Sequence, residues 1–133
     1  EGVKSGLIDV IVSDHTPEDE EGKRLPFAQA ATGAVGIETL LPLALEMHHN
    51  ESLPLTKIIE TLTINPAKIL KINKGTLNKG SDADMCMFDL NMPWVVNGDN
   101  LNSKSKNTSI EGRKLQGKVL MTFLNGELVF NSQ

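Results

Sequence analysis

Apolar and polar residues follow different patterns in different parts of this chain of 133 residues. Residues 8–12 are mostly β-branched and apolar, which is typical of a strand buried on both faces in a parallel sheet. A polar stretch over residues 15–35 predicts a long loop. Beyond residue 71, short apolar runs separated by turn residues predict β structure to the end of the chain.

The middle of the chain predicts three helices. Apolar side chains recur at helical spacing over residues 37–49, and Pro42 inside this stretch predicts either a later start or a kink. A second apolar stripe predicts a helix over residues 54–62. Asn65 and Pro66 are typical of an N-cap and a first helical residue, so a third, short helix is expected to follow, ending near residue 70.

The second half predicts short strands. The runs MCMFDL (residues 85–90) and WVV (residues 94–96) are two strand candidates, and residues 97–112 indicate a long polar loop. Two further strands flank Asn125-Gly126, which is a strong hairpin signal. A parallel strand needs a crossover and a second strand, and neither is visible here. We therefore expect the tail of a larger α/β protein.

Composition narrows the range of functions. The net charge is −4 with acidic and basic residues interspersed, so no basic patch indicates a nucleic-acid partner. No apolar run approaches about 18 residues, so no membrane span is expected. The single cysteine, Cys86, permits no internal disulfide and fits a reducing, cytoplasmic compartment.

Asp14 and His15 follow the predicted strand at its carboxyl end, where α/β barrels place catalytic groups. A carboxylate there can ligate a divalent metal and accept a proton from water. Asp14 could instead cap the loop by accepting backbone N–H bonds. His15 could orient a ligand, contact a substrate or pack in the loop. The two residues alone leave these alternatives open.

Short motifs at fixed spacing surround this pair. They are D-H-x-P, then E-x-K, then G-x-x-G-x-E-T, with Leu-Pro near the start of the next helix. The residues concerned are Asp14, His15, Pro17, Glu21, Lys23, Ala30, Gly33, Gly36, Glu38, Thr39, Leu41 and Pro42. This pattern resembles the dihydroorotases of the amidohydrolase superfamily, in the branch that also contains hydantoinases and allantoinases.

The resemblance continues to the end of the chain. TINPAKIL is similar to an S-x-N-P-A helix of these enzymes, and KGTLNKGSDADMCMFDLN to their K-G-x-I-x-x-G-x-D-A-D segment. The stretch from residue 103 to residue 130 is similar to their terminal K-S-x-N-T-P-F-x-G pattern and closing hairpin. Nearly the whole chain is covered.

The resemblance implies an α/β fold in two parts. Residues 1–70 would be the end of a TIM-like (β/α)8 barrel, its last strand and the following helices, and residues 71–133 part of a small β-sandwich. The parent would be a zinc-dependent hydrolase that interconverts dihydroorotate and N-carbamoyl-aspartate in pyrimidine synthesis. It would be a homo-oligomer with a small-molecule substrate. This chain would be a fragment that is inactive alone.

The resemblance also implies roles for particular residues. Asp14 would ligate one zinc ion of a binuclear pair and shuttle a proton in catalysis. His15, Thr32 and Gly33 would bind the substrate. The other metal ligands of these enzymes lie upstream of the matched segment, so this segment alone would not hold the metals. His48 and His49 stand side by side at a helix end, where a solvated turn is expected.

Three departures from the pattern widen the choice of function. Glu18 stands where a substrate-binding histidine is usual, Ala31 replaces a proline, and Ser109-Ile110 replaces Pro-Phe. An acid facing a substrate carboxylate would repel it. A non-catalytic partner of aspartate carbamoyltransferase is therefore one alternative, and a hydantoinase- or allantoinase-type cyclic amide hydrolase is another.

Overall fold

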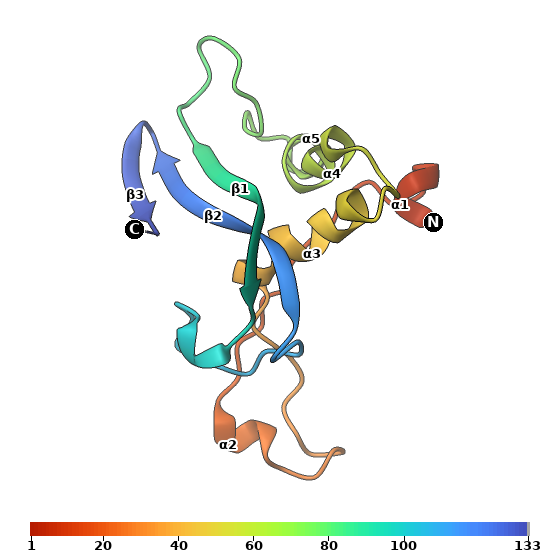
Figure 1. Cartoon of the computed structure of the whole chain (residues 1–133), viewed down its shortest axis with the longest axis vertical. Coiled ribbons are helices and arrows are strands. Elements are labelled where there is room, and N and C mark those ends of the chain that lie inside the picture. Colours follow the sequence, from red (N-terminus) through yellow and green to blue (C-terminus); the bar gives the residue numbers. More distant parts are fainter. Residues whose placement is uncertain (133) are drawn as a thin grey trace.

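The computed structural model describes residues 1–132 and has five α-helices and three strands in that part of the chain. Figure 1 shows most of the helices on one side of the molecule and a curved sheet on the other, with one short helix on a separate loop at the bottom. The mixed α/β content agrees with the sequence. The elements are α1 (Gly2–Ser5), α2 (Glu20–Lys23), α3 (Ile37–His49), α4 (Leu55–Leu62), α5 (Ile64–Leu70), β1 (Met85–Val95), the 3-10 helix η1 (Gly98–Asn100), β2 (Lys114–Leu124) and β3 (Glu127–Asn131).

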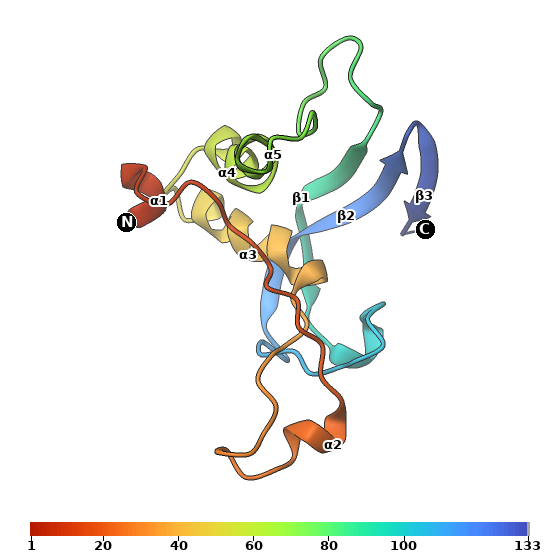
Figure 2. The same cartoon turned by 180° about the vertical axis from the view of Figure 1, so that it is seen from behind.

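The predicted strand over residues 8–12 is wrong. These residues run past α3 without joining a sheet (Figure 2). Their contacts to α4 and α5 are isolated: the N–H of Ile11 donates to the Thr61 carbonyl at 3.2 Å, and Asn65 Nδ2 donates to the Asp9 carbonyl at 2.9 Å. A strand is defined by a ladder with a neighbour, and no other strand of residues 1–132 lies beside this segment.

The predicted helix over residues 37–49 is confirmed as α3, which begins at Ile37 and contains Pro42. The second helix is confirmed as α4, with Pro54 as its N-cap. The predicted Asn65 cap is wrong, because α5 begins at Ile64 and Thr63 is its N-cap. Proline fits the third helical position as well as the first, since the first four N–H groups of a helix have no intrahelical acceptor.

The three strands form one antiparallel sheet in the order β1-β2-β3. The predicted hairpin is confirmed, with Asn125 (φ 51°) and Gly126 (φ 83°) in its turn. The two strands expected near residues 85–90 and 94–96 form one strand, β1, with an irregularity between Asp89 and Pro93. Asp89 Oδ1 accepts the N–H groups of Asn91 and Met92, at 2.8 and 2.9 Å, and this local turn interrupts the ladder.

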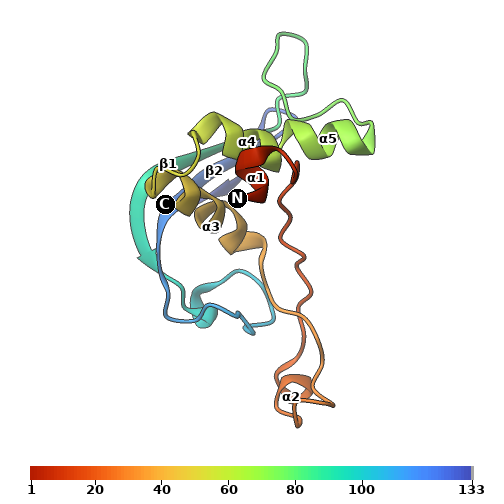
Figure 3. The ribbon, with the colours of Figure 1, turned by 90° about the vertical axis from the view of Figure 1, so that its right-hand side faces the viewer.

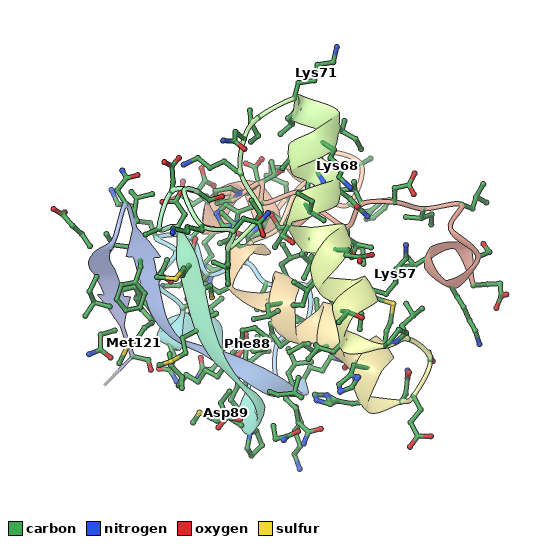
Figure 4. All side chains as sticks on the ribbon, turned by 90° about the horizontal axis from the view of Figure 1, so that it is seen from above. Lys57, Lys68, Lys71, Phe88, Asp89 and Met121 are labelled. Carbon is green, nitrogen blue, oxygen red and sulfur yellow. The ribbon has the colours of Figure 1, made fainter. Side chains whose placement is uncertain are left out.

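Helix α3 lies between the sheet and α4 and contributes Ala44 and Leu45 to the core. Leu45 of α3, Ile58 of α4 and Val96 are fully buried. Figure 4 views this arrangement from above, with Lys57, Lys68 and Lys71 along α4 and α5 and with Phe88 and Met121 on the sheet. Within residues 1–132, no helix is long and apolar enough to cross a membrane.

Candidate functional site

Asp14 lies where the extended segment turns away from α3. Its backbone is left-handed, with φ 45°, a conformation that aspartate tolerates better than most residues. Its carbonyl accepts the Thr16 hydroxyl at 3.1 Å. The carboxylate is exposed and accepts no hydrogen bond from residues 1–132. The loop-capping alternative is therefore wrong, and the carboxylate stands free for other chemistry.

Two glycines place the chain after the polar loop directly against the Asp14 segment. A Cβ atom on Gly33 would lie 2.5 Å from the Thr16 carbonyl oxygen, and one on Gly36 would lie 2.7 Å from the Ser13 carbonyl oxygen. Gly33 also has φ 130°, which side chains disfavour. The Thr16 N–H donates to the Ala34 carbonyl at 3.0 Å. Figure 3 shows the segment around Asp14 and the segment before α3 side by side, above the excursion of the chain over residues 17–32 that carries α2.

The imidazole of His15 caps α3. Its Nδ1 accepts the N–H of Gly36 at 3.0 Å and that of Ile37 at 3.4 Å. These bonds satisfy backbone donors at the helix N-terminus, and they require that Nδ1 carries no proton. The structure thus gives His15 an orienting contact of its own within the fold, with Nε2 left for another partner.

Two hollows lie beside this junction. The first, of about 550 Å³, is lined by Asp14 and Gly33 together with apolar residues of α3 and the Ser109-Ile110 turn. The second, of about 940 Å³, is lined by His15, Glu18 and Lys23 with the loop over residues 103–107. The structure therefore brings Asp14 and Gly33 together, whereas His15 faces the other hollow. Thr32 lines neither and is exposed.

Asn107 is a site residue that the sequence analysis did not single out. Its Oδ1 accepts the Glu18 N–H at 3.3 Å, and its Nδ2 donates to the Gly33 carbonyl at 3.1 Å. Its own carbonyl accepts the Val35 N–H at 3.2 Å. Asn107 thus joins the segment after Asp14 to the segment after the excursion. Its place in the terminal K-S-x-N-T motif was the available signal.

Glu18 is half-buried, and its backbone is fixed by Asn107 and by the Ser105 hydroxyl, which donates to the Glu18 carbonyl. Its carboxylate forms no ion pair within the described part of the chain. Arg24, a nearby cation, pairs with Glu20 instead. The charge of Glu18 is therefore not neutralised by a direct contact.

Asp14 is the one candidate metal ligand that the sequence analysis placed in this chain. Residues 1–132 hold no group of three or more His, Cys, Asp and Glu side chains able to bind a metal ion. The free carboxylate of Asp14 fits a zinc ligand, and it would supply one ligand of a larger set.

The expected solvated turn at His48 and His49 is wrong for His49, because its Nε2 is buried without a hydrogen-bond partner among the described residues.

Comparison with known proteins assigns the chain to a family. The sequence profile of the amidohydrolase family matches residues 1–129. The chain belongs to the amidohydrolase family. Among solved amidohydrolase-like structures, a D-hydantoinase superimposes with a TM-score of 0.87 at 25% identity, covering 98% of this chain and 30% of its own. The L-hydantoinase of Arthrobacter aurescens gives a TM-score of 0.85 at 34% identity, with the same coverage.

Curated relatives of this amidohydrolase chain are more similar in sequence. The dihydroorotase of Ehrlichia chaffeensis is 44% identical over 133 residues, which is 100% of this chain and 30% of that protein. The dihydroorotase of Aquifex aeolicus is 43% identical over 130 residues, 98% of this chain and 31% of that protein. The chain thus spans about 30% of the length of these relatives.

Proposed function

We propose that the parent protein is a dihydroorotase, which reversibly hydrolyses the dihydroorotate ring to N-carbamoyl-aspartate in pyrimidine synthesis in the cytoplasm. The observation that carries this proposal is the 44% identity to a dihydroorotase along the whole chain, against 25% and 34% for the hydantoinase structures. This chain would contribute one part of the catalytic site and would be inactive alone. The parent is expected to assemble as a homo-oligomer.

In this proposal, residues 1–70 end a (β/α)8 barrel and residues 71–133 belong to a small β-sandwich. The support is the unpaired extended segment before Asp14. Ile8 and Val12 are 47% and 69% exposed, although their apolar, β-branched side chains suit a strand covered on both faces. Such a segment fits the last barrel strand, with neighbouring strands supplied by the rest of the parent.

Asp14 is the catalytic residue of the proposal. Bound zinc would polarise the ring carbonyl and lower the pKa of the attacking water, and Asp14 would be one of its ligands. The Asp14 carboxylate takes the proton from the attacking water and delivers it to the ring nitrogen as the carbon–nitrogen bond breaks. Its exposed position and its lack of a hydrogen-bond donor within residues 1–132 suit both tasks. The backbone at Gly33, which lines the same hollow as Asp14, is assigned to substrate binding together with the backbone at Thr32 and the imidazole of His15.

Glu18 favours a second candidate, a non-catalytic subunit that associates with aspartate carbamoyltransferase. In that case an acid would stand where a substrate carboxylate would otherwise be bound, at no functional cost. The free Asp14 carboxylate weighs against this candidate, since a structural subunit has no need of it.

The test is a substrate panel with the full-length parent. Purified parent, loaded with zinc, is assayed for ring opening of dihydroorotate, hydantoin and allantoin, and its association with aspartate carbamoyltransferase is measured by size-exclusion chromatography. The proposal requires dihydroorotate to have the highest kcat/KM. No ring opening, with a stable complex formed, would establish the non-catalytic subunit. Preference for hydantoin or allantoin would make the enzyme a hydantoinase- or allantoinase-type cyclic amide hydrolase.

A further inference from the structure

Lys23, at the end of α2, reaches across to two carbonyl groups of the glycine loop. Its Nζ donates to the Ala31 carbonyl at 2.7 Å and to the Gly33 carbonyl at 3.0 Å. Gly33 O receives a second donor, Asn107 Nδ2, at 3.1 Å. Two side chains, Lys23 from α2 and Asn107 from the second half of the chain, therefore converge on the backbone of residues 31–33.

These contacts fix the direction of two backbone donors. In a trans peptide the C=O and N–H groups point in opposite directions, and no peptide bond of the described chain is cis. The Ala31 carbonyl shares its peptide plane with the Thr32 N–H, and the Gly33 carbonyl shares its plane with the Ala34 N–H. Both N–H groups therefore point away from Lys23, and neither finds an acceptor within residues 1–132.

The positive charge of Lys23 strengthens its hydrogen bonds to the two carbonyl groups and polarises the N–H groups of the same peptides. Hydrogen bonds from an ammonium group are stronger than those from neutral donors, and a polarised amide carbonyl makes the N–H of the same peptide a better donor. Asn107 supports the same arrangement from the opposite half of the chain through its contacts to Glu18 and Val35.

We propose that Lys23 is a positioning residue of the substrate site. It holds the peptide planes that follow Ala31 and Gly33, so that the N–H groups of Thr32 and Ala34 are presented, polarised, to an oxygen of the substrate. The inference rests on the proposed function, and it assigns to Lys23 a part in the binding of a cyclic imide or carboxylate oxygen. Lys23 itself does not touch the substrate.

The test uses the full-length, zinc-loaded parent and three variants. Lys23→Met removes the donors and the charge but keeps the aliphatic stem, Lys23→Arg keeps both donors and charge, and Arg24→Met is the matched control. Arg24 is the neighbouring cation and contacts only Glu20 by a side-chain bond. Thermal unfolding of each variant shows whether it is folded, and Lys23→Ala, which also lacks a donor, replaces Lys23→Met where the latter fails to fold.

The expected result is a loss of kcat/KM for dihydroorotate of about tenfold or more in Lys23→Met, seen chiefly as a raised KM, with activity retained in Lys23→Arg and Arg24→Met. A residue that only stabilised the fold would lower the unfolding temperature and would leave KM unchanged in the folded fraction. Unchanged KM in Lys23→Met would overturn the inference.

A second readout does not depend on turnover. In parent labelled with ¹⁵N at threonine and alanine, the amide resonances of Thr32 and Ala34 are compared between wild type, Lys23→Met and Arg24→Met without substrate. Shifts in Lys23→Met alone would support the positioning of these two donors even in a parent that fails to open dihydroorotate, and identical spectra would contradict it. Failure of the proposed function and failure of this inference are thus distinguished.

Discussion

Gly117 of β2 lies directly against Leu45 of α3. A Cβ atom on Gly117 would be 2.5 Å from Leu45 Cδ1, and Leu45 is fully buried. The Gly117 carbonyl accepts a hydrogen bond from Trp94 Nε1 at 3.0 Å. Helix α3, which begins at the site, and the sheet of the second half of the chain are therefore joined at a contact with no spare volume.

This contact predicts non-additive effects on stability. We expect Gly117→Ala to lower the free energy of unfolding by about 1–3 kcal/mol through overpacking, in addition to the strain of a side chain at φ 102°. Leu45→Ala should cost about 2–5 kcal/mol through the cavity that it leaves. Because the smaller side chain at position 45 makes room for the added methyl group, the double variant should lose less than the sum of the two. Equilibrium urea unfolding of the full-length parent measures all three, and strict additivity would contradict the account.

Local patterns predicted the elements that depend on local physics. The apolar stripe of α3 and the Asn125-Gly126 turn appear in the structure where the sequence placed them, because helical spacing and left-handed turn residues act over a few positions. The strand over residues 8–12 failed for the opposite reason. Its strand character requires neighbours that a local pattern cannot supply, and none lies within residues 1–132.

The candidate site was predictable only in part. The motif around Asp14 indicated its position, but its left-handed backbone and the separation of Asp14 and His15 into two hollows are properties of the folded chain. Asn107 acts through hydrogen bonds to residues 74 and 89 positions away, which no spacing rule connects. The direction of the Lys23 side chain likewise depends on where the glycine loop returns after the excursion.

The ion cluster of Lys74 with Asp82 and Asp84 predicts that the stability of the protein depends on pH. Hydrogen bonds to Asp82 and Asp84, at 2.7 and 2.5 Å, raise the pKa of Lys74 above its usual 10.5. The Lys74 ammonium and the Asn125 N–H lower the pKa of Asp84 below its usual 3.8. The Asp84 contribution to stability is thus present above pH 3.8 and lost as the pH falls through its lowered pKa. The Lys74 contribution is present below pH 10.5 and lost as the pH rises through its raised pKa.

We therefore expect Lys74→Met to lower the unfolding temperature of the parent at neutral pH, with the difference from wild type shrinking in strong acid and in strong base. Lys79→Met, in the same loop and exposed, is the control. Thermal unfolding followed by circular dichroism across pH measures the difference. A difference that stays constant at all pH values would show that the ion cluster does not cause it.

Replacing Glu18 by histidine is expected to raise the activity of the parent. The half-buried carboxylate has no ion pair in the described chain and lines the hollow that His15 and Lys23 share. In a dihydroorotase, Glu18→His should raise kcat/KM for dihydroorotate by about tenfold or more, which corresponds to about 1.4 kcal/mol of recovered transition-state binding. Steady-state kinetics of the full-length variant measure the change. Absence of activity in both forms would count for the non-catalytic subunit.

The central claim is that the Asp14 carboxylate is a catalytic residue of the parent, and replacing Asp14 tests this claim most directly. Asparagine tolerates the left-handed backbone of Asp14, so Asp14→Asn should fold normally, but its amide neither carries a proton nor ligates as an anion. Asp9→Asn, five residues earlier on the same extended segment, is the control for the loss of one negative charge.

The decisive measurement is the rate of dihydroorotate ring opening by the full-length, zinc-loaded parent and by these two variants, with unfolding temperatures recorded in parallel. The account predicts that Asp14→Asn loses about a hundredfold or more in kcat at an unchanged unfolding temperature, while Asp9→Asn keeps its activity. A folded Asp14→Asn variant that opens dihydroorotate as fast as the wild type would contradict the account.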